Sequence, residues 1–193
     1  MKSTIKLAAL APALLLGGCL SFGGEAPDSL LTLTPTATVP AGAGAPMSQS
    51  NAIALVEFGS TKAIDVTRVP VQVTDTELAY LQDAVWVDRP ARLFGQLVAE
   101  TIRSRTGRMV VDGDDPGLNA ADRLHGSLRA FGYDARTREV VVVFDAVRNG
   151  AGASAISRRF EARVPVTAPE TAFVGPALNQ AANQVAGEIA DWL

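Results

Sequence analysis

The sequence predicts a two-layer α/β sandwich, in which two amphipathic helices pack on one face of a mixed, mostly antiparallel sheet. Two observations predict this fold. Three consecutive segments between residues 124 and 166 have strand patterns, and two segments, 90–106 and 176–192, carry apolar residues at helical spacing. Because 48% of the 193 residues are hydrophobic, the chain can form one sizeable core. We expect one folded unit that follows an N-terminal extension.

The N-terminal extension has the pattern of an export signal. Lys2 and Lys6 precede or flank the apolar run 7–16, which is too short to span a bilayer and is followed by Gly18 and Cys19. This pattern resembles the lipobox of bacterial lipoproteins, so residues 1–18 are expected to be a signal peptide cleaved between Gly18 and Cys19. The Cys19 thiol would then carry lipid, and several acyl chains hold a protein on a membrane stably. An ordinary secretory signal with an unpaired cysteine is the alternative.

Residues 19–28 are expected to form a lipidated flexible tether, and residues 29–193 the domain. Gly, Ala, Pro, Ser and Thr dominate 21–50 and bury little apolar surface, except at 30–34, where one strand is expected. Leu20 follows the cysteine rather than an aspartate. By resemblance to enterobacterial sorting, this favours the periplasmic side of the outer membrane.

The next segments predict three strands. Residues 53–58 form an apolar run, residues 66–74 alternate, and 77–87 is the expected hairpin partner of 66–74. Pro70 lies in the second of these strands and lacks an N–H donor. It therefore favours a position at the edge of the sheet.

A helix is predicted from Asp88 to Thr106. Asp88 is the expected N-cap acceptor, Pro90 fits the first turn, and Gly107 fits the left-handed position after the helix. Its apolar stripe consists of Phe94, Leu97, Val98, Thr101 and Ile102. Such a stripe predicts packing against the sheet.

The second half of the chain predicts a meander and a closing helix. A short strand at 109–111 precedes a polar turn at 112–117, and three antiparallel strands follow at 124–132, 140–147 and 156–166. The connections at 135–138 and 149–153 are expected to be hairpin loops. The closing helix is expected to begin at Pro176 and to pack beside the first helix.

The residues that carry chemistry are few, and they predict no catalytic, cofactor or metal site. His125 is the only histidine and Cys19 the only cysteine, so the usual triads lack their members. Asp112, Asp114, Asp115 and Asn119 suggest calcium, but Pro116 and Arg123 stand where an EF-hand needs ligands, so a polar turn is preferred. The net charge of −3 argues against nucleic acid as a partner.

Two sets of residues are candidates for a partner surface. Tyr80 and Trp86 precede the first helix, and aromatic side chains with a polar group are frequent at interfaces, although core packing is the simpler interpretation. Arg129, Arg159 and Arg163 are expected to share the open face of the sheet and to accept an acidic partner. A solvated face is the alternative for them.

Together these segments resemble the ABC-type transport auxiliary lipoprotein family over about residues 29–192. The resemblance is carried by the lipobox at Cys19 and by four segments: Leu30-Leu31-Thr32-Leu33-Thr34-Pro35, Val69-Pro70-Val71, 84–91, and Ile189-Ala190-Asp191-Trp192. Aromatic residues common in the family are replaced by Leu30 and Leu31, and the family's Leu-Asp-Arg segment before the tryptophan is not recognisable.

The resemblance implies a non-enzymatic accessory protein that partners an MCE-domain protein in an intermembrane lipid or hydrophobic-solute transport system. Two alternatives remain open. One is a carrier lipoprotein that binds a phospholipid acyl chain in its own cavity between sheet and helices. The other is a structural lipoprotein of an unrelated envelope assembly such as lipopolysaccharide export.

Overall fold

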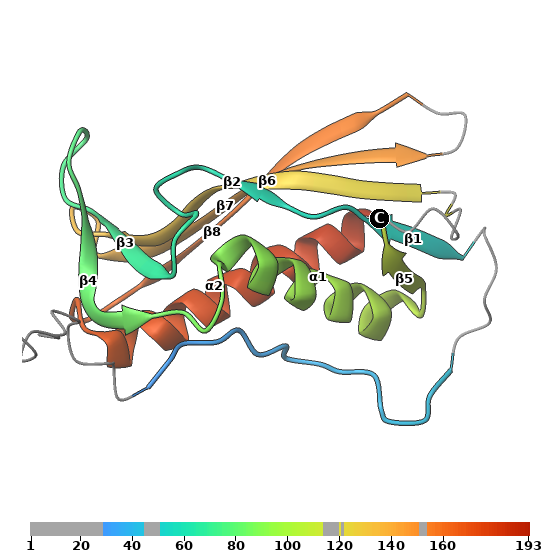
Figure 1. Ribbon diagram of the computed structural model, residues 1–193, viewed down its shortest axis with the longest axis horizontal. Helices are drawn as coiled ribbons and strands as arrows, with labels where there is room; N and C mark the ends of the chain where they lie inside the picture. The colour runs from blue at the N-terminus through green and yellow to red at the C-terminus, as the bar shows by residue number, and fades with distance from the viewer. Residues whose placement is uncertain (1–28, 45–50, 114–119, 121, 151–153) are drawn as a thin grey trace, which may run out of the picture.

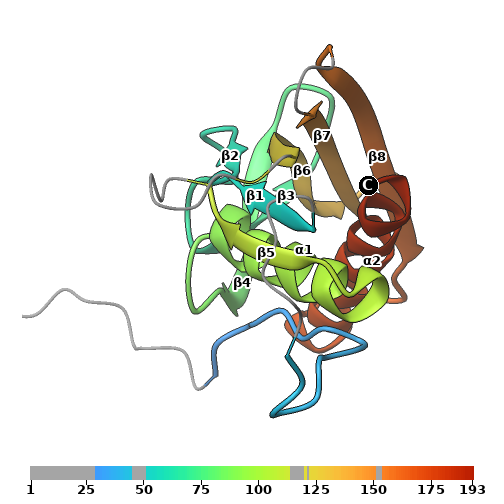
Figure 2. The same ribbon diagram turned by 90° about the vertical axis from the view of Figure 1, so that its right-hand side faces the viewer.

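An eight-stranded sheet carries two helices on one face (Figure 1), in a computed structural model that describes residues 29–44, 51–113, 120, 122–150 and 154–193. The view along the sheet shows that both helices cover the same face (Figure 2). The predicted two-layer α/β fold is therefore confirmed. Within the described ranges, no helix is both long and apolar enough to cross a bilayer.

The central strand of the sheet is β6 (Asp122–Asp134), and one of its edges pairs antiparallel with β7 (Glu139–Gly150). β7 in turn pairs antiparallel with β8 (Ile156–Pro165), so the predicted meander is confirmed. Residues 135–138 form the tight turn between β6 and β7, with Arg138 at φ 57°. These are the longest pairings in the sheet, and they join the alternating strands β6 and β8 to the largely apolar strand β7.

The other edge of β6 pairs with three short parallel strands laid end to end: β1 (Ala52–Leu55), β2 (Gly59–Ser60) and β3 (Arg68–Gln72). Beyond them, β5 (Met109–Asp112) is parallel to β1, and β4 (Leu78–Val85) forms the predicted hairpin with β3. The edge position predicted for Pro70 is wrong, because β3 lies between β4 and β6. A register shift between Arg68 and Pro70 accommodates the residue without an N–H donor.

Helix α1 (Pro90–Thr106) ends as predicted, with Gly107 at φ 65° and its N–H bonded to the Arg103 carbonyl. The predicted Asp88 cap is wrong. Arg89 is the N-cap residue, because a residue before proline is driven into extended conformation, and its side chain makes no capping bond. Asp88 lies one residue further out and accepts a hydrogen bond from the Arg89 N–H at 2.7 Å.

Helix α2 (Thr171–Trp192) begins five residues before the predicted start at Pro176. Pro176 is exposed, and water can therefore bond the carbonyl that its missing N–H leaves free. The added turn brings Val174 and Gly175 into the buried layer. Thr171 Oγ1 donates to the Gln82 carbonyl at 3.2 Å, which fixes the start of α2 beside β4.

Aromatic rings fill the core between the sheet and α1. Phe58 lies 4.6 Å from Phe144, Phe94 lies 5.2 Å from Phe144, and Trp86 lies 5.5 Å from Phe131, measured between ring centroids. Tilted pairs at these separations add to the free energy gained from burial alone. This cluster fixes the position of α1 against the sheet.

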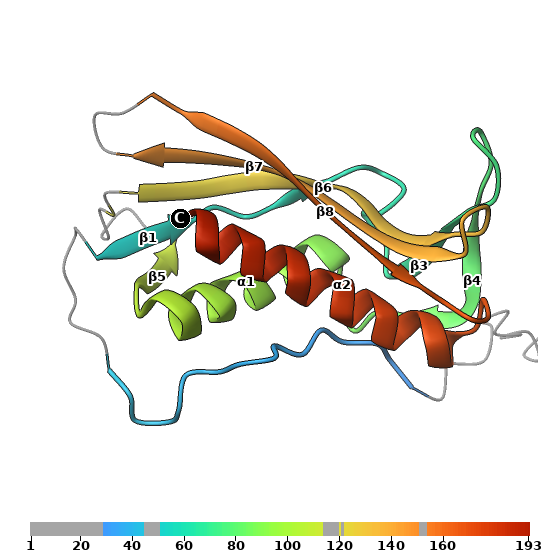
Figure 3. The same ribbon diagram turned by 180° about the vertical axis from the view of Figure 1, so that it is seen from behind.

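Residues 29–39 run in extended form along the side of the helices that faces away from the sheet, and we call them the strap (Figure 3). The strand predicted at 30–34 is reduced to one parallel bridge between Leu31 and Trp86. Further on, side chains of both helices bond the strap backbone: Thr34 N to Asn179 Oδ1 (2.8 Å), Thr36 N to Asn183 Oδ1 (2.9 Å), Asn183 Nδ2 to Thr34 O (2.9 Å) and Val39 N to Glu100 Oε1 (2.8 Å).

Candidate functional site

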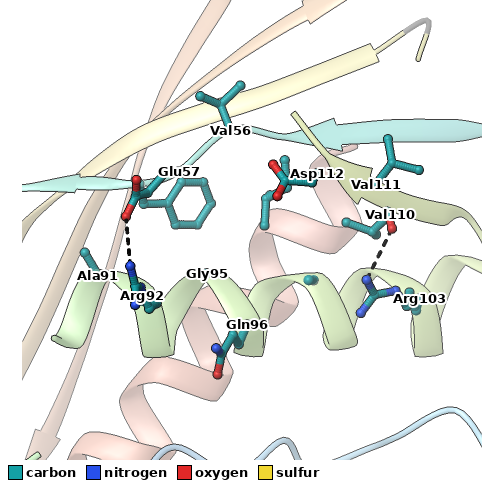
Figure 4. Close-up of a pocket in the computed structure, with 13 residues that line it drawn as sticks. Val56, Glu57, Ala91, Arg92, Gly95, Gln96, Arg103, Val110, Val111 and Asp112 are labelled. Atoms are coloured by element: carbon teal, nitrogen blue, oxygen red, sulfur yellow. Dashed lines mark hydrogen bonds and ion pairs between the residues drawn. The ribbon is translucent and has the colours of Figure 1, made fainter. Parts of the chain in front are cut away.

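A groove of about 410 Å³ lies between α1 and the strand ends of β1 and β5 (Figure 4), and we call it the α1 groove. The helix lines it with Ala91, Gly95 and Ala99, which are four residues apart and so share one face. Leu55 and Phe58 are among the residues on the strand side. Small side chains on the helix thus leave room beside an apolar wall.

Charged side chains join the helix to the strands at both ends of the groove. At one end Arg92 lies 3.9 Å from the Glu57 carboxylate, and both side chains are exposed. At the other end Arg103 donates to the Val110 carbonyl at 3.2 Å (Figure 4). The exposed Arg92–Glu57 pair contributes little to stability, so that end of the groove can open without a large loss of free energy.

A second hollow of about 670 Å³ continues from the α1 groove past Glu57 and Arg92 towards Asp65 and Arg89. Arg89 forms an ion pair with Asp65 at 3.2 Å. The combined surface has an apolar centre and charged margins. Such an arrangement suits an amphipathic ligand or a partner segment with both kinds of side chain.

The structure gives no support for a metal site in the ranges it describes, where no group of three or more His, Cys, Asp or Glu side chains comes together. Most of the predicted polar turn that follows Asp112, with Asp114, Asp115 and Asn119, lies outside the described residues. His125 is half-buried in β6, with Nε2 3.2 Å from Asn149 Nδ2. This contact between β6 and β7 gives His125 a structural role.

The three arginines proposed for a partner surface lie on the open face of the sheet, as the alternation predicted. Arg159 and Arg129 both donate to the Asp145 carboxylate, at 2.6 Å and 2.8 Å. The hydrogen bond from Arg159 has the largest effect on the Asp145 carboxylate. Together with the bond from Arg129 it holds the pKa of Asp145 below its ordinary value of 3.8, although burial acts to raise that pKa. Arg163 donates to Glu161 at 2.6 Å. Because all three are paired with carboxylates, an acidic partner would have to compete for them.

A smaller hollow of about 300 Å³ lies on the same open face beside Arg129 and Arg163. Val141, Val143 and Leu78 contribute apolar surface to it. Apolar and cationic groups therefore meet on the open face as well.

The two aromatic residues proposed for the partner surface differ in their exposure. Trp86 is 1% exposed and packs against Phe131, so its assignment to a partner surface is wrong and the simpler interpretation of core packing holds. Its backbone pairs with both Thr67 and Leu31, which places the ring inside. Tyr80 is half-buried under the Arg68 guanidinium, 4.1 Å from its ring centre.

The predicted lipidation and cleavage residues, Gly18 and Cys19, lie outside the described residues. Sequence reasoning missed the α1 groove. A signal for it exists in the four-residue spacing of Ala91, Gly95 and Ala99, which marks a strip of helix too small to fill its side of the core. No sequence signal reveals the strap contacts, because the helix side chains there bond backbone groups.

Comparison with solved structures supports the fold. A crystal structure from Xanthomonas campestris, assigned to family DUF330, superposes with a TM-score of 0.71 at 20% identity, covering 85% of this chain and 93% of that one. A crystal structure titled only as an uncharacterized protein gives a TM-score of 0.65 at 15% identity, covering 85% of this chain and 99% of that one. At these identities the likeness shows the fold alone. No protein with a curated function matches significantly.

The model of one protein family, described as ABC-type transport auxiliary lipoprotein component, matches residues 31–190. This range includes the strap bridge at Leu31, helix α1, the whole sheet and all of α2 except its last two residues. The chain therefore belongs to the ABC-type transport auxiliary lipoprotein component family.

Proposed function

We propose that this protein is a non-enzymatic, lipid-anchored auxiliary subunit that docks onto the MCE-domain protein of an ABC-type intermembrane transport system. The observation that carries the proposal is the family match over residues 31–190, which includes the whole sheet and nearly all of both helices. In this proposal a separate permease and ATPase supply the energy, and lipid or another hydrophobic solute is transported.

The anchor in this proposal is Cys19, which is acylated after removal of residues 1–18 and holds the domain on the periplasmic side, at the outer membrane. The strap supports this anchoring role. The chain that follows the tether is held by hydrogen bonds from its backbone to Asn179, Asn183 and Glu100 before it enters the first strand. A pull on the tether would thus be transmitted to both helices.

Complementation of a deletion strain tests the proposal. We expect loss of the gene to raise outer-membrane permeability and surface-exposed phospholipid under envelope stress, and the wild-type gene to restore both. Cys19→Ala, which cannot be acylated, should fail to restore them even when the exported protein accumulates normally. An unchanged envelope in the deletion strain would contradict the proposal.

The α1 groove favours a second candidate, a carrier that holds a phospholipid acyl chain itself. Its floor of Ala91, Gly95 and Ala99 faces apolar strand residues, and pockets of several hundred Å³ hold small ligands in many proteins. Mass spectrometry of lipids extracted from the purified protein tests this candidate. Stoichiometric lipid that is lost in Gly95→Leu, which fills the groove, and kept in Gln180→Leu, which adds an exposed leucine on α2 away from the groove, would support a carrier.

A further inference from the structure

Strongly exposed large hydrophobic side chains gather at one end of the molecule. Of the six such side chains among the described residues, five lie at the end that holds the β3–β4 hairpin, the start of the strap and the start of α2 (Figure 1): Leu30, Val73, Leu78, Val87 and Phe173. The sixth, Ile156, lies in the β7–β8 hairpin at the opposite end. We call the first region the anchor end.

Strand alternation explains why two of these side chains face outward. Leu31 pairs in parallel with Trp86, and the Trp86 ring points into the core. Neighbouring residues in extended chain point to the opposite side, so Leu30 and Val87 face solvent, with 51% and 55% of their surface exposed. Both side chains therefore lie beside the start of the strap, where the described chain begins.

The predicted tether limits how far the anchor end can lie from the membrane. The predicted tether, residues 19–28, is ten residues long and leads directly to the described chain. Fully extended, ten residues span at most about 33–36 Å, and a flexible Gly-rich chain of that length has a typical end-to-end distance of about 17 Å. The acyl chains at Cys19, which belong to the proposed function, would therefore keep this end of the domain next to the bilayer.

We propose that the anchor end rests on the lipid bilayer, with Leu78, Val87 and Phe173 in the boundary between headgroups and acyl chains. Interfacial binding scales with the apolar area that enters this boundary. The hairpin carries Asp75, Glu77 and Asp83 against the single cation Arg68, so attraction to anionic lipid does not drive the contact. Contact with zwitterionic vesicles should consequently persist at high salt.

This orientation directs the opposite end, with β1, β5 and the β7–β8 hairpin, away from the membrane (Figure 3). A partner that spans the periplasm would meet that end first. The membrane contact thus sets which surface of the domain is free for docking.

Site-specific fluorescence in vesicles tests the inference. Because acylation blocks the thiol of Cys19, the only cysteine, an introduced cysteine is the single free thiol of the lipoprotein. Leu78→Cys and Val87→Cys report on the anchor end, Ile156→Cys is the matched control, and Val73→Cys replaces either variant that fails to fold. Each is labelled with an environment-sensitive dye and reconstituted in phosphatidylcholine vesicles containing nitroxide lipid.

We expect the dyes at 78 and 87 to lose most of their fluorescence to the nitroxide lipid, at low and high salt, and the dye at 156 to be unaffected. Equal quenching at all positions, or none at 78 and 87, would overturn the inference. Shielding of these dyes that persists in detergent and rises with protein concentration would instead assign the patch to a second copy and also overturn it. Mass spectrometry of the same preparation detects acylation, so a failed anchor, which contradicts the proposed function, is distinguished from a wrong orientation.

Discussion

Replacing Asn183 with alanine should release the strap. Asn183 is buried in α2, and its side-chain amide accepts from Thr36 N and donates to Thr34 O, both at 2.9 Å. A hydrogen bond of this kind contributes about 1 kcal/mol net, so losing the two bonds to the strap costs roughly 1–3 kcal/mol. The third bond of the amide, to the Asn179 carbonyl within α2, is lost with them. The lower part of this range is expected if the strap detaches, because its backbone groups then bond to water rather than remain buried and unpaired.

Urea unfolding of the soluble Cys19→Ser protein measures this loss, and hydrogen exchange locates it. We expect the amides of residues 32–39 to exchange much faster in Asn183→Ala, while those of β6 and β7 keep their protection. Asn179→Ala is the matched control, because it removes one exposed bond, to Thr34 N at 2.8 Å, and should cost about 1 kcal/mol or less. If Asn183→Ala matched the control in stability and left the strap amides protected, our explanation of how the strap is held would be refuted.

Release of the strap would also change the geometry of the anchor. Release of the whole strap, including the Leu31–Trp86 bridge, would free about twenty residues, 19–39, instead of ten. For a flexible chain this raises the typical end-to-end distance from about 17 Å to about 25 Å. If Cys19 carries the proposed anchor, the strap therefore sets how closely the domain is held to the membrane.

Three further substitutions test the packing and the electrostatics. Gly95→Ala should stabilise the protein by up to about 1 kcal/mol in urea unfolding, because alanine favours helix and the new Cβ would meet Phe58 at 3.7 Å, an ordinary contact. Gly126→Ala should destabilise by about 1–3 kcal/mol or more in the same assay, since its Cβ would overlap the Asp145 carbonyl oxygen. Burial raises the pKa of Asp122, but hydrogen bonds and charge attraction from Arg108 and Arg148 together hold it below 3.8. The contribution of Asp122 to stability is therefore present above that pH and is lost as pH falls through the lower folded-state value. Acid titration of unfolding should accordingly show a smaller loss in Asp122→Asn than in the wild type.

Patterns within one segment predicted correctly those elements whose form depends on residues close together in the sequence. The stripe from Phe94 to Ile102 and the glycine at 107 placed α1 and its end correctly, because periodicity and a left-handed cap depend on neighbouring residues. The meander of β6 to β8 followed from alternation in its outer strands and from the nearly continuous apolar run at 140–147 in its middle strand.

Tertiary contacts explain the errors. Pro70 is accommodated inside the sheet by a register shift, and Pro176 lies inside α2 at an exposed position, so neither marks an edge or a start. Trp86 is buried through its pairing with Leu31, a residue 55 positions away in the chain. The strap and the α1 groove arise from contacts between distant segments, which periodicity within one segment does not encode.

Affinity purification of the tagged protein from gently solubilised envelopes, with mass spectrometry of the recovered proteins and lipids, tests the central claim most directly. Cys19→Ala, which lacks the anchor, serves as the control for contacts that depend on the membrane. We expect an MCE-domain protein to be recovered with the wild type, without stoichiometric lipid. Recovery of lipid with no such protein, or of a different envelope assembly, would contradict the claim that this lipoprotein is the auxiliary subunit of an MCE transport system.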